Sequence, residues 1–375
     1  MDMQADVIVI GAGLIGLAIA DELARRGRRV RVLADRPVRN TASWAGAGML
    51  TPHPERSWHP VSEQLCLRSF EMYPAFVGDL QERTGVDCEL RMDGLLVTAG
   101  DVAGERNLRE RTEELRDAGR EARWLDAVAV RETEPALSVQ EHGGILLADT
   151  GQVNNRQLLA ALEAACLKRG VTIDREAAGV RLVVEGERVR GVQTAAGPLT
   201  APVVVNAAGA WAHVLPGVPD AAVVPVKPVK GQMLAFELAS EPIRRVTWAD
   251  GLFLVPGAGR RLLVGATLEQ NAGFDERVTA GTVHDLIGKA QARCPALAGA
   301  ALVEAWAGLR PGTPDELPCV GATPVEGYVL ACGHYRNGIV LTPVTALQVA
   351  DLLDGKADAV DRAFTLERFR PAAAA

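Results

Sequence analysis

Short apolar runs alternate with amphipathic stretches at the start of the chain. The run Val7–Ile10 is apolar throughout and too short for a helix, which is typical of a buried parallel strand. Residues 14–26 carry acids early and arginines late, so they predict a helix whose charges complement its dipole. Gly27 suits the end of that helix, and residues 30–33 predict a second strand. Two acid–arginine pairs on the helix are spaced for i,i+4 ion pairs: Asp21–Arg25 and Glu22–Arg26.

The pattern changes in the middle of the chain. Apolar spacing and caps predict helices over 62–83, 104–119, 154–169, 279–294 and 343–354. Apolar runs predict strands over 179–184, 188–194, 203–207 and 329–332. Residues 223–268 alternate like antiparallel strands, and Asp93-Gly94 predicts a hairpin between 89–92 and 95–98. Together these patterns predict an α/β (α+β) fold that combines a parallel and an antiparallel sheet.

A glycine-rich turn follows the first predicted strand. Gly11, Gly13 and Gly16 give the spacing G-x-G-x-x-G, in which the glycines allow the turn, the approach of a pyrophosphate and close helix packing. A tight turn without a ligand is the alternative, and the strand–helix–strand context favours a dinucleotide site. Ala34 stands where an acid usually binds the ribose. Either Asp35, one position later, reaches the ribose, or the backbone and a water do.

Composition narrows the partners and the compartment. The net charge of −7 argues against nucleic acid or an anionic membrane as partner, and the apolar start lacks the charge pattern of a targeting segment and the length of a membrane span. The six cysteines show no C-x-x-C spacing, so we expect reduced thiols and a cytoplasmic protein. At 375 residues the chain is long enough for two domains. We identify no metal-ligand pattern.

Three later stretches are candidates for chemistry. Arg310 ends an apolar run, and because its charge cannot be shed it either caps carbonyl groups or holds an anion. A glycine-containing loop ends in Thr342-Pro343, which predicts an N-cap threonine and a helix whose positive end points back at whatever the loop surrounds. In the apolar strand over 252–255, Phe253 faces one side and its neighbours face the other.

Motifs spread in order over nearly the whole chain resemble the D-amino-acid-oxidase group of flavoproteins, and most closely its ThiO-type glycine oxidases. They are VIGAGLIGLAIA, SWAGAGML, VVVNAAGAWA, PVKGQML, VPGAGRRLLVGAT, WAGLRPGTPD and CGHYRNGI. The resemblance implies a Rossmann-like FAD-binding domain of the glutathione-reductase type, formed by residues 1–85, 150–222 and 318–375. It also implies an interleaved antiparallel-sheet substrate-binding domain, formed by residues 86–149 and 223–317.

The resemblance also implies a set of site residues. FAD would contact Gly11, Gly13, Leu14, Ile15, Gly16, Ala34, Asp35, Ala42, Ser43, Ala47, Gly48, Met49, Val180, Ala208, Gly209, His334, Tyr335, Arg336, Asn337, Gly338, Ile339 and Val340. The substrate pocket would be formed by Arg310, Arg336, Phe253, Met49 and Leu268, with Arg310 holding the substrate carboxylate. Phe253 and Leu268 depart from the family, which carries tyrosine and methionine there. Gly308 stands where some relatives carry a flavin-linking cysteine, so we expect non-covalent FAD.

The implied activity is FAD-dependent oxidative deamination of glycine or another small amine such as sarcosine or D-alanine. Hydride transfer to the flavin would give an imine or glyoxylate, ammonia and hydrogen peroxide, with molecular oxygen as acceptor and a link to thiamine biosynthesis. Rival hypotheses are a D-amino-acid or imino-acid dehydrogenase that reduces a quinone, a nicotinamide-dependent reductase, and a flavin-binding assembly subunit without activity. We expect a homo-oligomer, either a dimer or a tetramer.

Overall fold

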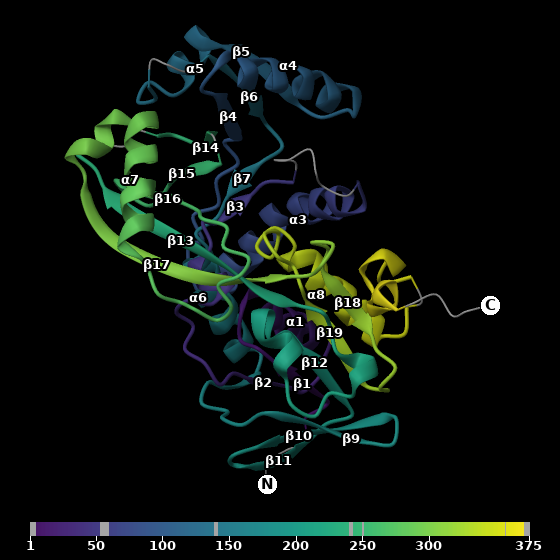
Figure 1. Ribbon diagram of the computed structural model, residues 1–375. Helices are drawn as coiled ribbons and strands as arrows, with labels where there is room; N and C mark the ends of the chain where they lie inside the picture. Colours follow the sequence, from purple (N-terminus) through teal and green to yellow (C-terminus); the bar gives the residue numbers. More distant parts are fainter. Residues whose placement is uncertain are drawn as a thin grey trace.

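The computed structural model describes residues 5–52, 60–138, 142–239, 243–249, 251–356 and 358–370. Figure 1 shows a parallel-sheet layer with its helices in one half of the molecule and a second, larger sheet in the other half. The ends of the chain, which the domain prediction includes, lie outside the described residues. In the described part, no helix combines the length and the apolar character that crossing a bilayer requires.

The parallel layer is a six-stranded sheet in the order β18-β19-β12-β1-β2-β8. Its strands are β1 (Val7–Ile10), β2 (Val30–Leu33), β8 (Thr172–Asp174), β12 (Val203–Asn206), β18 (Cys319–Ala322) and β19 (Tyr328–Cys332). Neighbouring strands run parallel except β18, which pairs antiparallel with β19. The strand predictions at 30–33, 203–207 and 329–332 are therefore confirmed to within one residue. Residues close in space here come from distant parts of the chain.

Helices cover one face of this sheet and a small sheet covers the other. The helices are α1 (Leu14–Arg25), α3 (Pro60–Thr84), α6 (Asn155–Lys168) and α8 (Thr342–Leu353). Val7 and Val9 pack toward these helices, whereas Ile8 and Ile10 pack toward β9 (Arg181–Glu185), β10 (Arg188–Thr194) and β11 (Gly197–Thr200). Burial on both faces explains why β1 has no polar residue.

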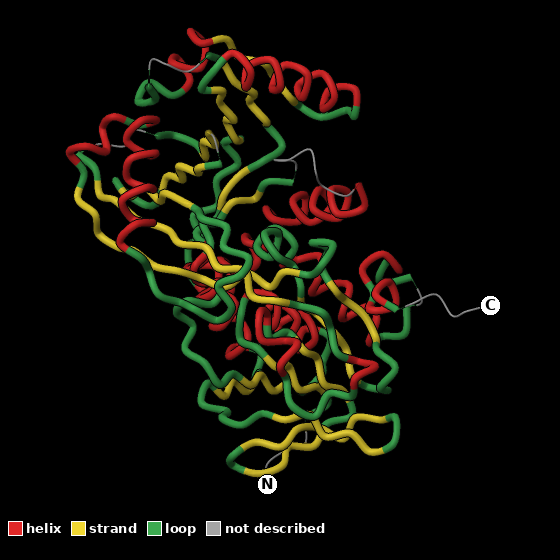
Figure 2. The backbone as a smooth tube through the Cα atoms, viewed as in Figure 1, coloured by secondary structure: helices red, strands yellow, loops and turns green. Residues whose placement is uncertain are grey.

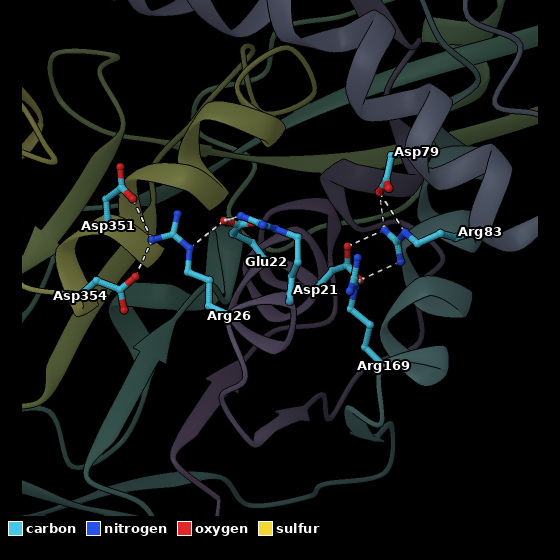
Figure 3. A network of polar contacts seen from close by, with 9 residues as sticks. Asp21, Glu22, Arg26, Asp79, Arg83, Arg169, Asp351 and Asp354 are labelled. Atoms are coloured by element: carbon cyan, nitrogen blue, oxygen red, sulfur yellow. Dashed lines mark hydrogen bonds and ion pairs between the residues drawn. The ribbon is translucent and has the colours of Figure 1, made fainter.

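The charges on α1 have partners that its own sequence does not show. Glu22 pairs with Arg26 as predicted, at 2.8 Å, but Asp21 does not pair with Arg25. Instead its carboxylate lies 2.7 Å from Arg83 of α3 and 3.0 Å from Arg169 at the end of α6 (Figure 3). Asp21 is 8% exposed because it lies on the face of α1 that packs against these helices. The prediction of an Asp21–Arg25 pair was wrong because tertiary partners replaced the local one.

The second half of the molecule is built on an eight-stranded sheet in the order β17-β13-β16-β15-β14-β4-β6-β5. Its strands are β4 (Leu95–Ala99), β5 (Ala122–Asp126), β6 (Gly143–Leu147), β13 (Lys227–Glu237), β14 (Val246–Ala249), β15 (Leu252–Pro256), β16 (Arg261–Gly265) and β17 (Ala301–Gly312). Neighbouring strands are antiparallel except β14 and β4. The long strands β13 and β17 of this sheet extend toward the parallel layer, as their positions in Figure 1 and the same view in Figure 2 show. Within 223–268, the antiparallel prediction is confirmed for the described strands β13, β14, β15 and β16.

Further helices complete this half. They are α4 (Val102–Asp117), α5 (Ala127–Thr133) and α7 (Ala280–Arg293), and α7 covers the sheet face that carries Leu234 and Leu254. The hairpin prediction at Asp93-Gly94 was wrong. Leu95–Ala99 pairs with β6 and β14, whereas Arg91 forms an isolated bridge with Gln152. The turn signal is local, and the two sides of this turn found better partners elsewhere.

Short elements connect the two halves. The segments that cross between the sheets contain helix α2 (Ala42–Ala45) and the strand pair β3 (Met49–Leu50) and β7 (Gly151–Gln152). The chain also contains short 3₁₀ helices: η1 (Gly209–Val214), η2 (Asp220–Ala222), η3 (Pro295–Gly299), η4 (Arg362–Phe364) and η5 (Leu366–Phe369). The six-stranded sheet takes its strands only from the segments assigned to FAD, and the eight-stranded sheet only from the others. The exact domain boundaries stay a prediction.

Candidate active site

A cavity of about 650 Å³ is lined by residues from both large sheets. Most of the predicted site residues line it: Gly11, Gly13, Leu14, Ile15, Ala34, Asp35, Ala42, Ser43, Ala47, Met49, Val180, Ala208, Gly209, Phe253, Arg310, His334, Tyr335, Arg336, Asn337, Gly338 and Ile339. Four predicted residues do not line it: Gly16, Gly48, Val340 and Leu268. The fold thus gathers segments from the start, middle and end of the chain around one space.

The glycine turn between β1 and α1 leaves no room for side chains. Gly11 has φ +112°, and a Cβ there would lie 2.3 Å from the carbonyl oxygen of Ala207. A Cβ on Gly16 would lie 1.9 Å from the carbonyl oxygen of Gly11. Gly16 therefore serves close packing of α1 against the turn, which explains why it lies behind the cavity surface. The turn matches the cradle that a pyrophosphate needs at a helix N-terminus.

Ser43 has a structural role that the sequence did not reveal. Its Oγ accepts a hydrogen bond of 2.9 Å from the backbone N–H of Leu14, the first residue of α1. The side chain of Asn155 in turn donates to the backbone carbonyl of Ser43 at 2.7 Å. Helix α2 is thereby tied to the starts of both α1 and α6. A serine 29 residues from the helix that it caps leaves no signal in the local sequence.

The end of the cavity at the C-terminus of β2 is the predicted adenosine site. Ala34 and Asp35 both line it, and the Asp35 side chain is half exposed, with its carboxylate 3.9 Å from Arg36. Arg36, which the sequence analysis did not single out, also lines the cavity, and its guanidinium lies 4.7 Å from the ring centre of Trp211. Which group binds the ribose stays a prediction.

Small residues form another side of the cavity. Ala42, Ala45, Gly46 and Gly308 line it, and a Cβ on Gly308 would lie 2.3 Å from the Cβ of Ala45. Such a surface fits a planar ring system that approaches the backbone closely. A cysteine in place of Gly308 would not fit without movement. Cys332 also lines the cavity, but it is 1% exposed and burial raises the pKa of its thiol well above the ordinary value, so the thiol is neutral.

The loop before α8 closes the cavity. Residues 334–339 line it, and His334 is buried with its Nε2 3.0 Å from the Thr345 hydroxyl. Burial lowers the pKa of His334 to about 3, so the ring is neutral at physiological pH. Thr342 is not the N-cap residue that we predicted. It lies inside α8, and its hydroxyl donates to the carbonyl of Gly338 at 2.8 Å. Helix α8 begins one residue earlier than predicted, with Leu341 at the N-cap position.

Arg310, on β17, brings a partly buried cation to the cavity. Its Nη1 donates to the carbonyl oxygens of Lys230 at 3.3 Å and Thr267 at 3.2 Å. Among the described residues, no carboxylate forms an ion pair with it. Burial, with a smaller contribution from the charge of Arg336, lowers the pKa of Arg310 to about 10, so the guanidinium stays protonated at neutral pH. Arg310 therefore donates to two carbonyl groups and also presents a positive charge to the cavity, where an anion would neutralise it.

Apolar side chains from neighbouring strands of the eight-stranded sheet also line the cavity. Phe253 lies opposite Gly265 in the ladder, and its ring centre is 4.9 Å from that of Trp248. Trp248 and Met233 line the cavity with it, although the sequence analysis did not name them. Leu268, by contrast, is 51% exposed and does not line the cavity. Its assignment to the pocket was wrong, because the chain leaves β16 at Gly265 and the cavity lining ends at Ala266.

Comparisons with known proteins agree with this geometry. The family model described as FAD dependent oxidoreductase matches residues 6–352. The glycine oxidase of Pseudomonas putida is 37% identical over 96% of this chain and 98% of its own length. The bifunctional protein ThiO/ThiG of Synechocystis sp. is 36% identical over 98% of this chain, which spans about half (55%) of that relative's length. The crystal structure of glycine oxidase from Geobacillus kaustophilus superposes with a TM-score of 0.93 at 35% identity, covering 98% of this chain and 100% of that one.

Proposed function

The chain belongs to the family of FAD-dependent oxidoreductases, and from this premise we propose that it catalyses the oxidative deamination of glycine or another small amine. The glycine cradle at α1 and the small-residue surface fit FAD, which when bound accepts a hydride and passes electrons to molecular oxygen. The products would be an imine or glyoxylate, ammonia and hydrogen peroxide. The glycine oxidases among the relatives support this activity.

The observation that carries the proposal is Arg310. It is a partly buried, protonated guanidinium that lines the cavity and has no carboxylate partner among the described residues. A guanidinium binds a carboxylate through two parallel hydrogen bonds, which fixes the substrate's orientation as well as its position. Hydride removal from the α-carbon needs this alignment more than it needs an acid or a base. Arg336 lines the same cavity and adds positive charge near the clamp.

The preferred substrate follows from the apolar side chains near the clamp. Phe253, Trp248 and Met233 offer carbon surface to a substituent on the amine or the α-carbon. Each buried methylene contributes about 0.8 kcal/mol of binding free energy. We therefore expect sarcosine, N-ethylglycine or D-alanine to compete well with glycine.

A link to thiamine biosynthesis is part of the proposal, because ThiO stands in the names of the bifunctional relatives. Molecular oxygen as electron acceptor and a homo-oligomeric state also belong to it.

The test is a panel of small amines with peroxide detection under air, run on the wild-type protein and on Arg310→Met. The wild type should form peroxide from at least one amine that carries a carboxylate. The kcat/KM of Arg310→Met should fall by a factor that corresponds to about 2–5 kcal/mol of transition-state stabilisation, as when one partner of a buried charge pair is truncated. The FAD content of the variant should stay at the wild-type level. Equal activity in the variant would show that Arg310 only caps carbonyl groups. Turnover that requires a quinone would favour the dehydrogenase hypothesis.

A further inference from the structure

The side of Arg310 away from the cavity is held by the segment of residues 266–277, which follows β16. The backbone of this segment supplies Thr267, whose carbonyl accepts from the guanidinium at 3.2 Å. The carbonyl of Lys230 on β13 accepts at 3.3 Å from the same nitrogen. A Cβ on Gly231 would lie 2.4 Å from that nitrogen, so the guanidinium occupies the space that a side chain there would fill. The Nη1 edge of the guanidinium is thus hydrogen-bonded to the protein backbone.

Lys230 fastens the segment to the sheet. Its side chain is 1% exposed, and its ammonium lies 3.1 Å from Asp275 and 3.7 Å from Glu269, both in the segment. The backbones of Lys230 and Glu269 also form two hydrogen bonds, of 3.2 Å and 3.0 Å. The carbonyl oxygen of Lys230 therefore accepts hydrogen bonds both from Arg310 Nη1 and from the backbone N–H of Glu269.

The hydroxyl of Thr267 adds a second fastening. It accepts from the backbone N–H of Gln232 at 2.9 Å and donates to the Glu269 carboxylate at 2.6 Å. The Gln232 side chain, 1% exposed, donates to the same carboxylate at 2.8 Å. Thr267 does not line the cavity. The two hydrogen bonds of its hydroxyl instead hold the Thr267 backbone in place, and the carbonyl of that backbone accepts from Arg310.

We propose that Lys230 and Thr267 are positioning residues that hold Arg310 in the orientation that binds the substrate carboxylate. The proposal rests on the proposed function in one respect, that Arg310 binds a carboxylate. Arginine loses considerable rotamer freedom when it binds a ligand in one geometry. A guanidinium already held on one edge has lost that freedom before the substrate arrives, so its remaining N–H groups bind the carboxylate more tightly.

The experiment measures carboxylate binding directly. Glycolate, which has the carboxylate of glycine and a hydroxyl in place of the amine, is titrated into the FAD-loaded protein, and its Kd is read from the flavin absorbance. The variants are Lys230→Met, Thr267→Val and Thr267→Ser, which keeps the hydroxyl. Arg277→Met is the matched control, because Arg277 is 86% exposed and pairs with Asp275 from the solvent side. Arg310→Met reports on the proposed function itself.

Lys230→Met and Thr267→Val should each weaken glycolate binding on the order of tenfold. The KM for the amine should rise by a similar factor while kcat stays within about twofold, because a carboxylate contact is made equally in the ground and transition states. Thr267→Ser and Arg277→Met should match the wild type. If Lys230→Met fails to retain FAD, the Thr267→Val and Thr267→Ser pair decides alone.

Two results separate the hypotheses. If Arg310→Met loses glycolate binding while Thr267→Val keeps the wild-type Kd, the positioning role is refuted and the proposed function stands. If Arg310→Met also binds glycolate like the wild type, the carboxylate clamp is wrong, and the positioning proposal is overturned with it. If kcat for the amine falls in Thr267→Val while the Kd for glycolate is unchanged, Thr267 has a general structural role. That result would also refute the proposal that Thr267 positions Arg310.

Discussion

Replacing Phe253 with tyrosine adds one hydroxyl to the apolar side of the substrate end of the cavity. The ring keeps its place on β15, opposite Gly265 and 4.9 Å from Trp248, because both residues have the same aromatic body. A Cβ on Gly265 would lie 2.8 Å from the side chain of Met233, so Met233 occupies the space that this glycine leaves. The resemblance to glycine oxidases implies a tyrosine at this position, whose hydroxyl would help Arg310 to hold the carboxylate.

The magnitude follows from one hydrogen bond and one methyl contact. A hydrogen bond to a charged carboxylate contributes about 1.5–3 kcal/mol, which corresponds to a decrease in the KM for glycine of roughly 10- to 150-fold. D-alanine gains the same bond, but its methyl group meets a more polar surface. Losing the burial of one methyl costs about 0.8 kcal/mol, so the preference for glycine over D-alanine should rise roughly fourfold.

The assay compares kcat/KM for glycine and D-alanine in the parent, in Phe253→Tyr and in Phe253→Leu. The leucine variant controls for the ring, because it keeps an apolar side chain and adds no hydroxyl. The tyrosine variant should act mainly through KM. An unchanged ratio of the two specificity constants in Phe253→Tyr would refute the reasoning, and the preference would then have to come from Trp248, Met233 or Met49.

Three further outcomes are expected. The purified protein should be yellow, and acid should release all of its flavin as FAD, because Gly308 occupies the linkage position; flavin that stays on the denatured chain would contradict this. Because burial lowers the pKa of His334 to about 3, kcat/KM should show no inflection from this ring between about pH 5 and 8; an inflection that disappears in His334→Asn would prove it wrong. Asp21→Asn should lower the free energy of unfolding by about 1.5–3 kcal/mol, whereas Asp79→Asn, which removes a 57% exposed partner of the same Arg83, should cost less than about 1 kcal/mol (Figure 3). Equal shifts in thermal denaturation would contradict the last prediction.

Much of the fold was predictable because its signals are local. The apolar run of β1, the glycine turn and the amphipathic α1 lie within one short stretch, and each acts through neighbours in the chain. Asn154 was predicted to cap α6, and its side chain does accept from the backbone N–H groups of Arg156 and Gln157. Caps, turns and periodicity are properties of a few consecutive residues, so the sequence alone carries them.

Predictions that depended on a choice of partner were less secure. Asp21 had a good partner four residues away and took two others from α3 and α6. Leu95–Ala99 had a good turn before it and paired with β6 and β14 instead. Leu268 follows a strand that reaches the cavity, yet the chain carries it to the surface. For Asp21 and Leu95–Ala99 the local pattern offered one partner, and the tertiary fold supplied others from distant segments.

The candidate site divides in the same way. The sequence by itself determined the nucleotide cradle and the presence of Arg310 before Pro311, because glycine spacing and residue type are written in the chain. Only the tertiary structure decided that Ser43 caps α1, that Trp248 and Met233 join Phe253, and that a strand 80 residues away holds Arg310. The physical reason is that strand pairing brings residues from distant segments together on one face of a sheet. These cross-strand neighbours set a side chain's environment, and no single local stretch of sequence contains them.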